Sequence, residues 1–253
     1  MRSANRQTGG MRIIFSRKGF DSTSGGGPSP IVNGRPVSLP IPATRFSETT
    51  YGSLGLEQQV RQASRGRLDA RDLCHHDPMF LPGGECLFGQ AGAAQTHLRN
   101  EGVRPGDVFL FFGLFADELT GERHHRIFGW MKIETMRNVA ELSADERRSL
   151  VARGHPHALG MHGRNDAIWS GPGGVATSAT GSLRLTVPGG PCSLWKRPSW
   201  LRPGGLSYHD RPDRWQEGGR LLTVSRGQEF VAPIGRRQAP RRWLAERIAE
   251  MND

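Results

Sequence analysis

Two apolar runs stand out in the pattern of hydrophobic and polar positions along the chain. Residues 11–15 are mostly aliphatic and aromatic, and residues 108–112 are entirely so. Short continuous runs rich in β-branched and aromatic side chains are typical of strands that are buried on both faces. A third apolar segment, 127–133, follows a polar stretch, 116–126, which we expect to be a loop. The pattern therefore predicts a sheet in which 11–15 and 108–112 are interior strands.

Three further segments have the pattern of helices. Residues 90–102 end at a glycine, and within residues 138–154 Ser143 and Glu146 have the spacing of a capping box. Residues 239–251 carry apolar and charged positions at helical spacing, which predicts an amphipathic helix near the C-terminus. Strands combined with such helices predict an α+β fold, with a mixed or mainly antiparallel sheet, flanking helices and that C-terminal amphipathic helix.

The N-terminus and the turn-rich segments suggest how the chain is organised. Residues 1–10 are polar and basic, so we expect a disordered extension before a single domain that spans 11–253. Asn33-Gly34 is a turn pair that predicts a hairpin. Residues 162–205 are rich in glycine and proline, and within them we expect strands at 166–169 and at 183–187.

The net charge and the cysteine content limit the class of protein. The formal net charge is +10, and nearly all cations are arginine, because lysine occurs only at positions 18, 132 and 196. Guanidinium groups suit phosphate geometry, so this charge favours an anionic partner, a nucleotide or nucleic acid. The three cysteines do not make a disulfide framework, which favours a reducing, cytoplasmic location. No apolar run approaches the ~20 residues of a membrane span, so we expect no membrane partner.

The first apolar run leads directly into a candidate binding site. It is followed by Ser16, Arg17, Lys18 and Asp21, and then by three glycines at 25–27. Glycines let backbone N–H groups approach a ligand closely, and Arg and Lys form charge-assisted hydrogen bonds to anions. The residue order is not that of a P-loop. We expect either a phosphate cradle at the end of a strand or a tight loop held by an Arg17–Asp21 ion pair.

A second group of polar residues lies at Cys74-His75-His76-Asp77-Pro78. These side chains could carry acid–base chemistry or bind zinc or iron, with Cys86 or His97 completing a metal site. The paired C-x₂₋₄-C spacing of structural zinc is absent, and the alternative is a loop that turns at the proline. We therefore name no metal ligand from the sequence and identify no cofactor.

Two other motifs contain histidine at informative spacing. Gln90, Ala94 and His97 share one face of the predicted helix, where a glutamine could bind a base edge; a polar face turned to solvent is the alternative. The segment His155-Pro156-His157 is too rigid for a flexible tail. It suits a ligand-binding or proton-transfer role as well as a structural one.

Several of these segments, taken together, resemble a known family, the nucleotide modification associated domain family, type three. The motifs that carry the resemblance follow the family's order: IIFSRKGFDS and PSPI within 13–31, SLPIP at 38–42, HHDP at 75–78, FGQ at 88–90, QTHL at 95–98, GDVFLFFG at 106–113, IFGW at 127–130, HPH at 155–157 and GQEFV at 227–231. The resemblance extends from about Met11 to the C-terminus. It implies an association with systems that modify bases in bacterial and phage nucleic acid, and it implies no particular reaction or catalytic residue.

A weaker resemblance is confined to residues 103–133. A PGD turn, an apolar strand, a polar loop and an I-x-G-x-x-x-I strand are similar to the core of PUA-like barrels such as the ASCH and EVE domains. This resemblance implies a barrel core and binding of RNA or modified bases. Trp130 is then a candidate for stacking on a flipped base, although an aromatic residue in a strand is more often part of the core.

These observations lead to two hypotheses for the function. One is an enzyme that acts on a nucleotide or on a base in DNA, and the other is a non-catalytic reader that binds modified bases in DNA or RNA through a basic, aromatic-lined pocket. The density of titratable groups favours the enzyme. The candidate catalytic residues are Asp21, His75, Asp77 and His97. The candidate ligand- or phosphate-binding residues are Ser16, Arg17, Lys18, Ser29, Arg45, Gln90 and Trp130.

Overall fold

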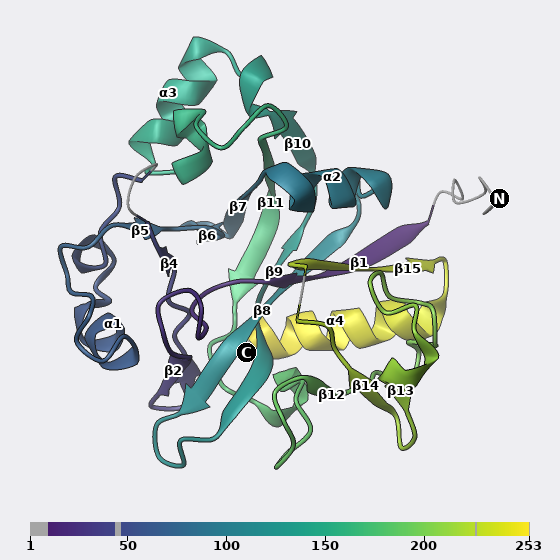
Figure 1. Ribbon diagram of the computed structural model, residues 1–253. Coiled ribbons are helices and arrows are strands. Elements are labelled where there is room, and N and C mark those ends of the chain that lie inside the picture. The colour runs from purple at the N-terminus through teal and green to yellow at the C-terminus, as the bar shows by residue number, and fades with distance from the viewer. Residues whose placement is uncertain (1–9, 44–46, 226, 253) are drawn as a thin grey trace.

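The computed structural model describes residues 10–43, 47–225 and 227–252, and its centre is a curled mixed sheet (Figure 1). Within these residues the sheet has ten strands, and its main path runs in the order β15-β1-β8-β9-β11-β7-β6. Strands β2, β3 and β10 pair beside this path. The bounds of the strands are β1 Met11–Arg17, β2 Ser29–Val32, β3 Arg35–Pro36, β6 Met79–Phe80, β7 Glu85–Gln90, β8 Val108–Asp117, β9 Arg123–Lys132, β10 Thr135–Asn138, β11 Ala167–Val175 and β15 Glu229–Gly235.

The sheet combines parallel and antiparallel pairing and curls into a half-barrel. Strand β1 runs parallel to β8 and antiparallel to β15, whereas β8, β9, β11 and β7 follow one another in antiparallel pairs. The ladder between β8 and β9 shifts its register between Phe111 and Phe112. Such a bulge bends a strand and increases its twist, so it contributes to the curl. The predicted α+β class with a mixed sheet and a barrel-like core is confirmed.

The two interior strands are buried on both faces, as their continuous apolar runs predict. Along β1, Ile13 and Phe15 pack into one core cluster, and Ile14, between them, packs into a second cluster on the other face. Strand β8 divides in the same way, with Phe112 in the first cluster and Phe111 in the second. Alternate side chains of a strand point to opposite faces, so a strand covered on both sides needs apolar residues at every position.

Four α-helices flank the sheet within the described residues: α1 Glu57–Ala63, α2 Gly92–Asn100, α3 Ala144–Ala152 and α4 Gln238–Asn252. In α3, Ser143 and Glu146 form the predicted capping box. Helix α4 is amphipathic as predicted, because Leu244 and Met251 are buried in the first core cluster, and it lies across one face of the half-barrel (Figure 1). None of the described helices is both long enough and apolar enough to span a bilayer.

Shorter elements complete the fold. Strand β4 (Ile41–Pro42) pairs with β5 (Cys74–His75), and a small separate sheet contains β12 (Leu194–Lys196), β14 (Arg220–Leu222) and β13 (Trp215–Gln216). Asn33-Gly34 connects β2 to β3, which confirms the predicted hairpin. The 3₁₀ helices are η1 Gly52–Leu54, η2 Val139–Glu141, η3 Pro156–Leu159, η4 Gly181–Leu183 and η5 Pro212–Arg214.

Two sequence-based expectations for secondary structure were wrong. The polar stretch 116–126 is mostly strand, because β8 and β9 extend through it and leave only a short turn. The sequence did not indicate this hairpin because its side chains are polar. Two of them, His124 and Arg126, are nevertheless buried, and Arg126 donates a hydrogen bond to the carbonyl oxygen of Thr180. The segment 183–187 is not a strand: Leu183 ends η4, and the residues after it make only single bridges.

The predicted extension over residues 1–10 lies, apart from Gly10, outside the described residues, and so does Arg45.

Candidate active site

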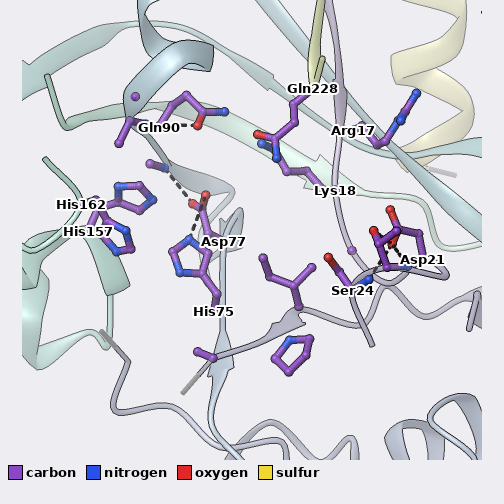
Figure 2. Close-up of a pocket in the computed structure, with 18 of the residues that line it drawn as sticks. Arg17, Lys18, Asp21, Ser24, His75, Asp77, Gln90, His157, His162 and Gln228 are labelled. Atoms are coloured by element: carbon purple, nitrogen blue, oxygen red, sulfur yellow. Dashed lines mark hydrogen bonds and ion pairs between the residues drawn. The ribbon is translucent and has the colours of Figure 1, made fainter. Parts of the chain in front are cut away.

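A cavity with a volume of about 720 Å³ opens where several strand ends meet. Its lining comes from the end of β1 and the loop that follows, from β4 and β5, and from the end of β7. Further lining comes from η3 and the loop after it, and from the segment leading into β15. Ser16 pairs with Glu229, so the end of β1 lies beside the start of β15. Loops that gather at strand ends are common places for ligand binding. Figure 2 shows Lys18 turned toward the side of Asp77 and the histidines, whereas the side chain of Arg17 points away from them.

One side of the cavity, the cation wall, consists of Arg17, Lys18 and Asp21. The Arg17 guanidinium donates hydrogen bonds to the carbonyl oxygens of Ser225 (2.8 Å) and Val224 (3.0 Å). Burial lowers the pKa of Arg17, and the charge of Asp21 acts in the opposite direction. Arginine remains protonated in proteins, so Arg17 places a cation at the cavity while it also holds the segment that leads into β15.

The Lys18 ammonium is paired with a buried carboxylate. Its Nζ lies 3.1 Å from Oε1 of Glu229, and the same oxygen accepts hydrogen bonds from Ser16 Oγ (3.1 Å) and Gln90 Nε2 (2.7 Å). Glu229 is only 1% exposed, and its Oε2 has no hydrogen-bond partner among the described residues. Burying a carboxylate costs several kcal/mol unless an opposite charge and hydrogen bonds compensate. Three predicted ligand-binding residues therefore meet at Glu229.

Asp21 also lines the cation wall, but its hydrogen bonds serve its own loop. Oδ1 accepts from the backbone N–H groups of Thr23 (2.8 Å) and Ser24 (2.7 Å) and from the Thr23 hydroxyl (2.7 Å). This is the geometry of an Asx turn. Arg17 bonds to backbone carbonyls elsewhere, so local bonds of Asp21, rather than an Arg17–Asp21 pair, hold this loop.

The opposite side, the histidine wall, consists of His75, Asp77, His157 and His162 (Figure 2). The His75 ring centroid lies 5.1 Å from that of His157 and 5.2 Å from that of His162, and the last two rings stack at 4.2 Å. His75 Nε2 lies 4.0 Å from Asp77 Oδ2. The nitrogen atoms that the three histidines offer all lie within 4.8 Å of one another, so these side chains could hold a metal ion.

The histidine wall is positioned from behind by two close contacts. His157 Nδ1 lies 2.5 Å from Oδ1 of Asp166, which is buried. On strand β7, the backbone N–H of Gly89 donates to Asp77 Oδ1 at 2.8 Å. A Cβ atom at Gly89 would lie 2.1 Å from Cδ2 of His157, so the strand can approach the ring only because it carries a glycine there.

The environment shifts the titration of this wall. Burial raises the pKa of Asp77 to about 7, while Lys18 acts against that rise. Burial lowers the pKa of His75 to about 3, and the neighbouring His157 and His162 act in the same direction. Burial likewise lowers the pKa of His157 to about 3. At neutral pH the rings of His75 and His157 are therefore neutral with available lone pairs, and Asp77 titrates in the range that suits general acid–base chemistry.

One known family matches residues 12–233 of the 253, the family described as nucleotide modification associated domain 3. The chain belongs to this family. No curated protein and no solved structure matches it. The matched span runs from β1 into β15 and contains both walls of the cavity. Membership in the nucleotide modification associated domain 3 family confirms the resemblance found in the sequence and associates the chain with nucleotide modification.

In this member of the nucleotide modification associated domain 3 family, the cavity collects some of the predicted catalytic residues but not all. Asp21, His75 and Asp77 line it together with Arg17. His97, on α2, lines a second cavity of about 630 Å³, where its ring stacks on Tyr208 with centroids 4.3 Å apart. Cys86 and His97 were the partners considered for a metal site with His75. Neither belongs to the histidine group around His75, because Cys86 is buried in the core and His97 lines the second cavity.

The predicted ligand-binding residues also divide. Arg17, Lys18 and Gln90 line the cavity, and Ser16 is buried behind it against Glu229. Ser29 instead accepts a hydrogen bond from the backbone N–H of Leu39 (3.1 Å). Trp130 donates from Nε1 to Asn252 at the end of α4 (3.4 Å) and does not line the cavity.

The sequence analysis missed three residues that shape the site: His162, Asp166 and Glu229. A signal existed for the first two, because residues 155–166 contain three histidines and one aspartate. That stretch has no helix or strand pattern from which these residues could be placed together. Glu229 lies within the GQEFV motif at 227–231, but the motif gave it no role, since its role depends on pairing with Lys18 across the β1–β15 ladder.

Proposed function

We propose that this protein is an enzyme that acts on a nucleotide, or on a base within DNA, at the cavity between the cation wall and the histidine wall. Family membership supports the nucleotide as substrate class. The observation that carries the enzymatic assignment is the convergence of Asp77 and three histidines opposite Arg17 and Lys18 in one cavity. Titratable groups with shifted pKa values gathered in a cleft are typical of active sites.

The cation wall suits the phosphate of such a substrate. Arg17 and Lys18 both line the cavity, one after the other at the end of β1. Charge-assisted hydrogen bonds from Arg to phosphate oxygens are among the stronger contacts in proteins. Because Glu229 already offsets the Lys18 charge, Arg17 supplies the larger share of the attraction in this proposal.

The histidine wall suits the chemical step. Asp77 has a pKa raised to about 7 by burial, so it can exchange a proton near neutrality. Gln90 lies at the rim, where its amide could contact a base edge if it gave up one internal bond. A substrate with its phosphate at the cation wall would then extend toward Asp77 and the three rings, which lie on the opposite side of the cavity (Figure 2).

The reader hypothesis receives less support from the same cavity. Among the described residues that line it, none is Phe, Tyr or Trp. Readers of flipped or single-stranded bases usually stack them on such rings. Trp130, the predicted stacking residue, contacts α4 instead.

The proposal is tested with purified protein, nucleoside mono-, di- and triphosphates, and single- and double-stranded oligonucleotides at low salt. Binding is measured by fluorescence anisotropy across salt concentrations, and reaction by mass spectrometry of the nucleotides or digested nucleosides. We expect binding that weakens with salt, because a basic chain displaces counterions from phosphate. We also expect a mass change that Asp77→Asn abolishes and that Asp210→Asn, outside this cavity, preserves. Binding without any mass change would favour a reader, and no binding at all would contradict both functions.

A further inference from the structure

The three histidines of the histidine wall converge from segments that are far apart in the chain. His75 comes from β5, His157 from η3, and His162 from the loop before β11. Their ring nitrogens lie within 4.8 Å of one another, and all three residues line the cavity. Packing three basic rings together is unfavourable whenever they are protonated, since the charges repel.

The bonding behind His157 determines which of its two ring nitrogens keeps a lone pair. Asp166 is buried, and its Oδ1 lies 2.5 Å from Nδ1 of the ring. A carboxylate accepts, so Nδ1 carries the hydrogen and Nε2 keeps its lone pair. Metal-binding histidines almost always donate their second nitrogen to a carboxylate or carbonyl in this way, which fixes the tautomer and increases the basicity of the ligand.

Two further features show a built arrangement rather than a chance meeting of rings. Gly89 lets β7 pack directly behind His157, since any Cβ atom there would collide with the ring at 2.1 Å. The same glycine donates its N–H to Asp77, whose Oδ2 lies 4.0 Å from His75 Nε2. Asp77 therefore gives the cluster a positioned oxygen donor beside the rings.

We propose that His75, His157 and His162 bind one divalent transition-metal ion, with an open position that faces the cation wall. Three imidazole ligands suit borderline ions such as Zn²⁺, Fe²⁺, Co²⁺ or Ni²⁺, whereas Mg²⁺ and Ca²⁺ prefer oxygen. Tetrahedral bonds of about 2.0–2.1 Å place ligand nitrogens roughly 3.4 Å apart, so modest side-chain rotations bring this cluster onto an ion.

The chemical consequence of this site rests on the proposed function. An ion in this position would polarise a phosphoryl oxygen or lower the pKa of a bound water next to the substrate. Asp77 would then lie beside the ion as an additional ligand or as a proton acceptor. The metal itself, however, is a property of the free protein and is tested without nucleotide.

The first test measures metal binding by untagged protein that has been dialysed against a chelator. Co²⁺ is titrated and followed by visible absorbance, and Zn²⁺ is titrated in competition with a chromophoric chelator. We expect one ion per chain. His75→Ala, His157→Ala and His162→Ala should each weaken Zn²⁺ binding by about 100-fold or more, and Asp166→Asn by about 10- to 100-fold. His97→Ala, at the second cavity, is the matched control and should bind like the parent.

A measurement on the unaltered protein keeps the test independent of how the variants fold. X-ray absorption of the Zn²⁺-loaded chain should show the scattering of about three imidazole ligands. Oxygen-only coordination, or affinity for Zn²⁺ and Co²⁺ that is unchanged in folded His157→Ala and His162→Ala proteins, would overturn the metal site. Absence of metal binding leaves the proposed nucleotide reaction standing, whereas a metal-binding protein without any reaction would count against the proposed function alone.

Discussion

The cation wall and the histidine wall face the same cavity, yet their polar atoms are used differently. On the cation wall the described side chains are bonded to the protein itself: Arg17 to two carbonyl oxygens, Lys18 to Glu229, and Asp21 to its own loop. On the histidine wall the orienting contacts come from behind, from Asp166 and Gly89, and the rings meet one another. The side chains of the cation wall therefore mainly hold the structure around the cavity, and we expect the chemical step to take place at the histidine wall.

The difference follows from the elements that carry each wall. The cation wall lies at the end of β1, which is paired on both sides along most of its length. The histidine wall comes from the two-residue strand β5, a 3₁₀ turn and a loop. Central strands fix positions through many shared hydrogen bonds, whereas short elements and loops can adjust to a ligand.

The largest expected effect comes from breaking the buried pair beneath the cation wall. Glu229→Gln leaves the Lys18 ammonium, whose side chain is 10% exposed, without its counter-charge. We expect a loss of about 3–5 kcal/mol in the free energy of unfolding, measured by urea denaturation. Gln228→Ala, the neighbouring position, is the control and should cost far less. In the double variant Lys18→Met/Glu229→Gln the loss should be smaller than the sum of the single losses; strict additivity would show that the two groups do not depend on each other.

The second effect is a pH dependence that originates behind the cation wall. His125 accepts a hydrogen bond from Trp195 Nε1 (3.0 Å), and burial, followed by the charge of Arg17, lowers its pKa to about 4. As the pH falls, His125 takes up a proton near pH 6.5 in the unfolded chain but only near pH 4 in the folded chain. Protonation of His125 therefore lowers the free energy of unfolding as the pH falls from about 6.5 to about 4. Between pH 7 and pH 5 the loss is about 2 kcal/mol.

The measurement compares urea midpoints across pH in the parent and in His125→Gln. Because the variant lacks this titration, its stability should fall less steeply over that pH range. Parallel curves would show that the His125 pKa is not lowered and that the region behind the cation wall is more open than the structure shows.

The third prediction separates the two roles of Arg17. Arg17→Met removes the positive charge. Arg17→Lys keeps the charge but loses the paired hydrogen bonds to the carbonyl oxygens of Ser225 and Val224. We expect nucleotide affinity to fall by more than about tenfold in the methionine variant, since a charge-assisted contact contributes ~1.5–3 kcal/mol. The lysine variant should retain most of the affinity but should unfold at lower urea. If the folded methionine variant binds like the parent, there is no phosphate cradle and the cation wall is frame alone.

The smallest expected effect concerns Asp21. Asp21→Asn keeps Oδ1, which accepts all three loop hydrogen bonds, so stability should stay within about 0.5 kcal/mol of the parent. Asp21→Ala removes the acceptor and should cost about 1–2 kcal/mol. Turnover should survive in the asparagine variant. A stable Asp21→Asn protein without turnover would show that Asp21 is catalytic and that the chemical step is not confined to the histidine wall.

Local sequence was sufficient for much of the fold. Continuous apolar runs require burial on both faces, and therefore 11–15 and 108–112 could be identified as interior strands. Capping and periodicity are also local, so Ser143 with Glu146 and the apolar face of α4 were predictable. Arg17, Lys18, His75 and Asp77 were identified as site candidates because each lies in a polar segment next to an apolar run or turn.

Tertiary structure alone decided which of these residues meet. His157 and His162 lie beside His75 only because η3 packs against β7 at Gly89. No spacing in the sequence encodes that contact. The spacing predicted that His97 and Gln90 share a helix face. That expectation was wrong, because Gln90 ends β7 before α2 begins at Gly92, and His97 lines another cavity. Glu229 reaches Lys18 through strand register, which depends on pairing between opposite ends of the chain. Local patterns determine burial and helix ends, whereas contacts between distant segments depend on how the strands pair and how the sheet curls.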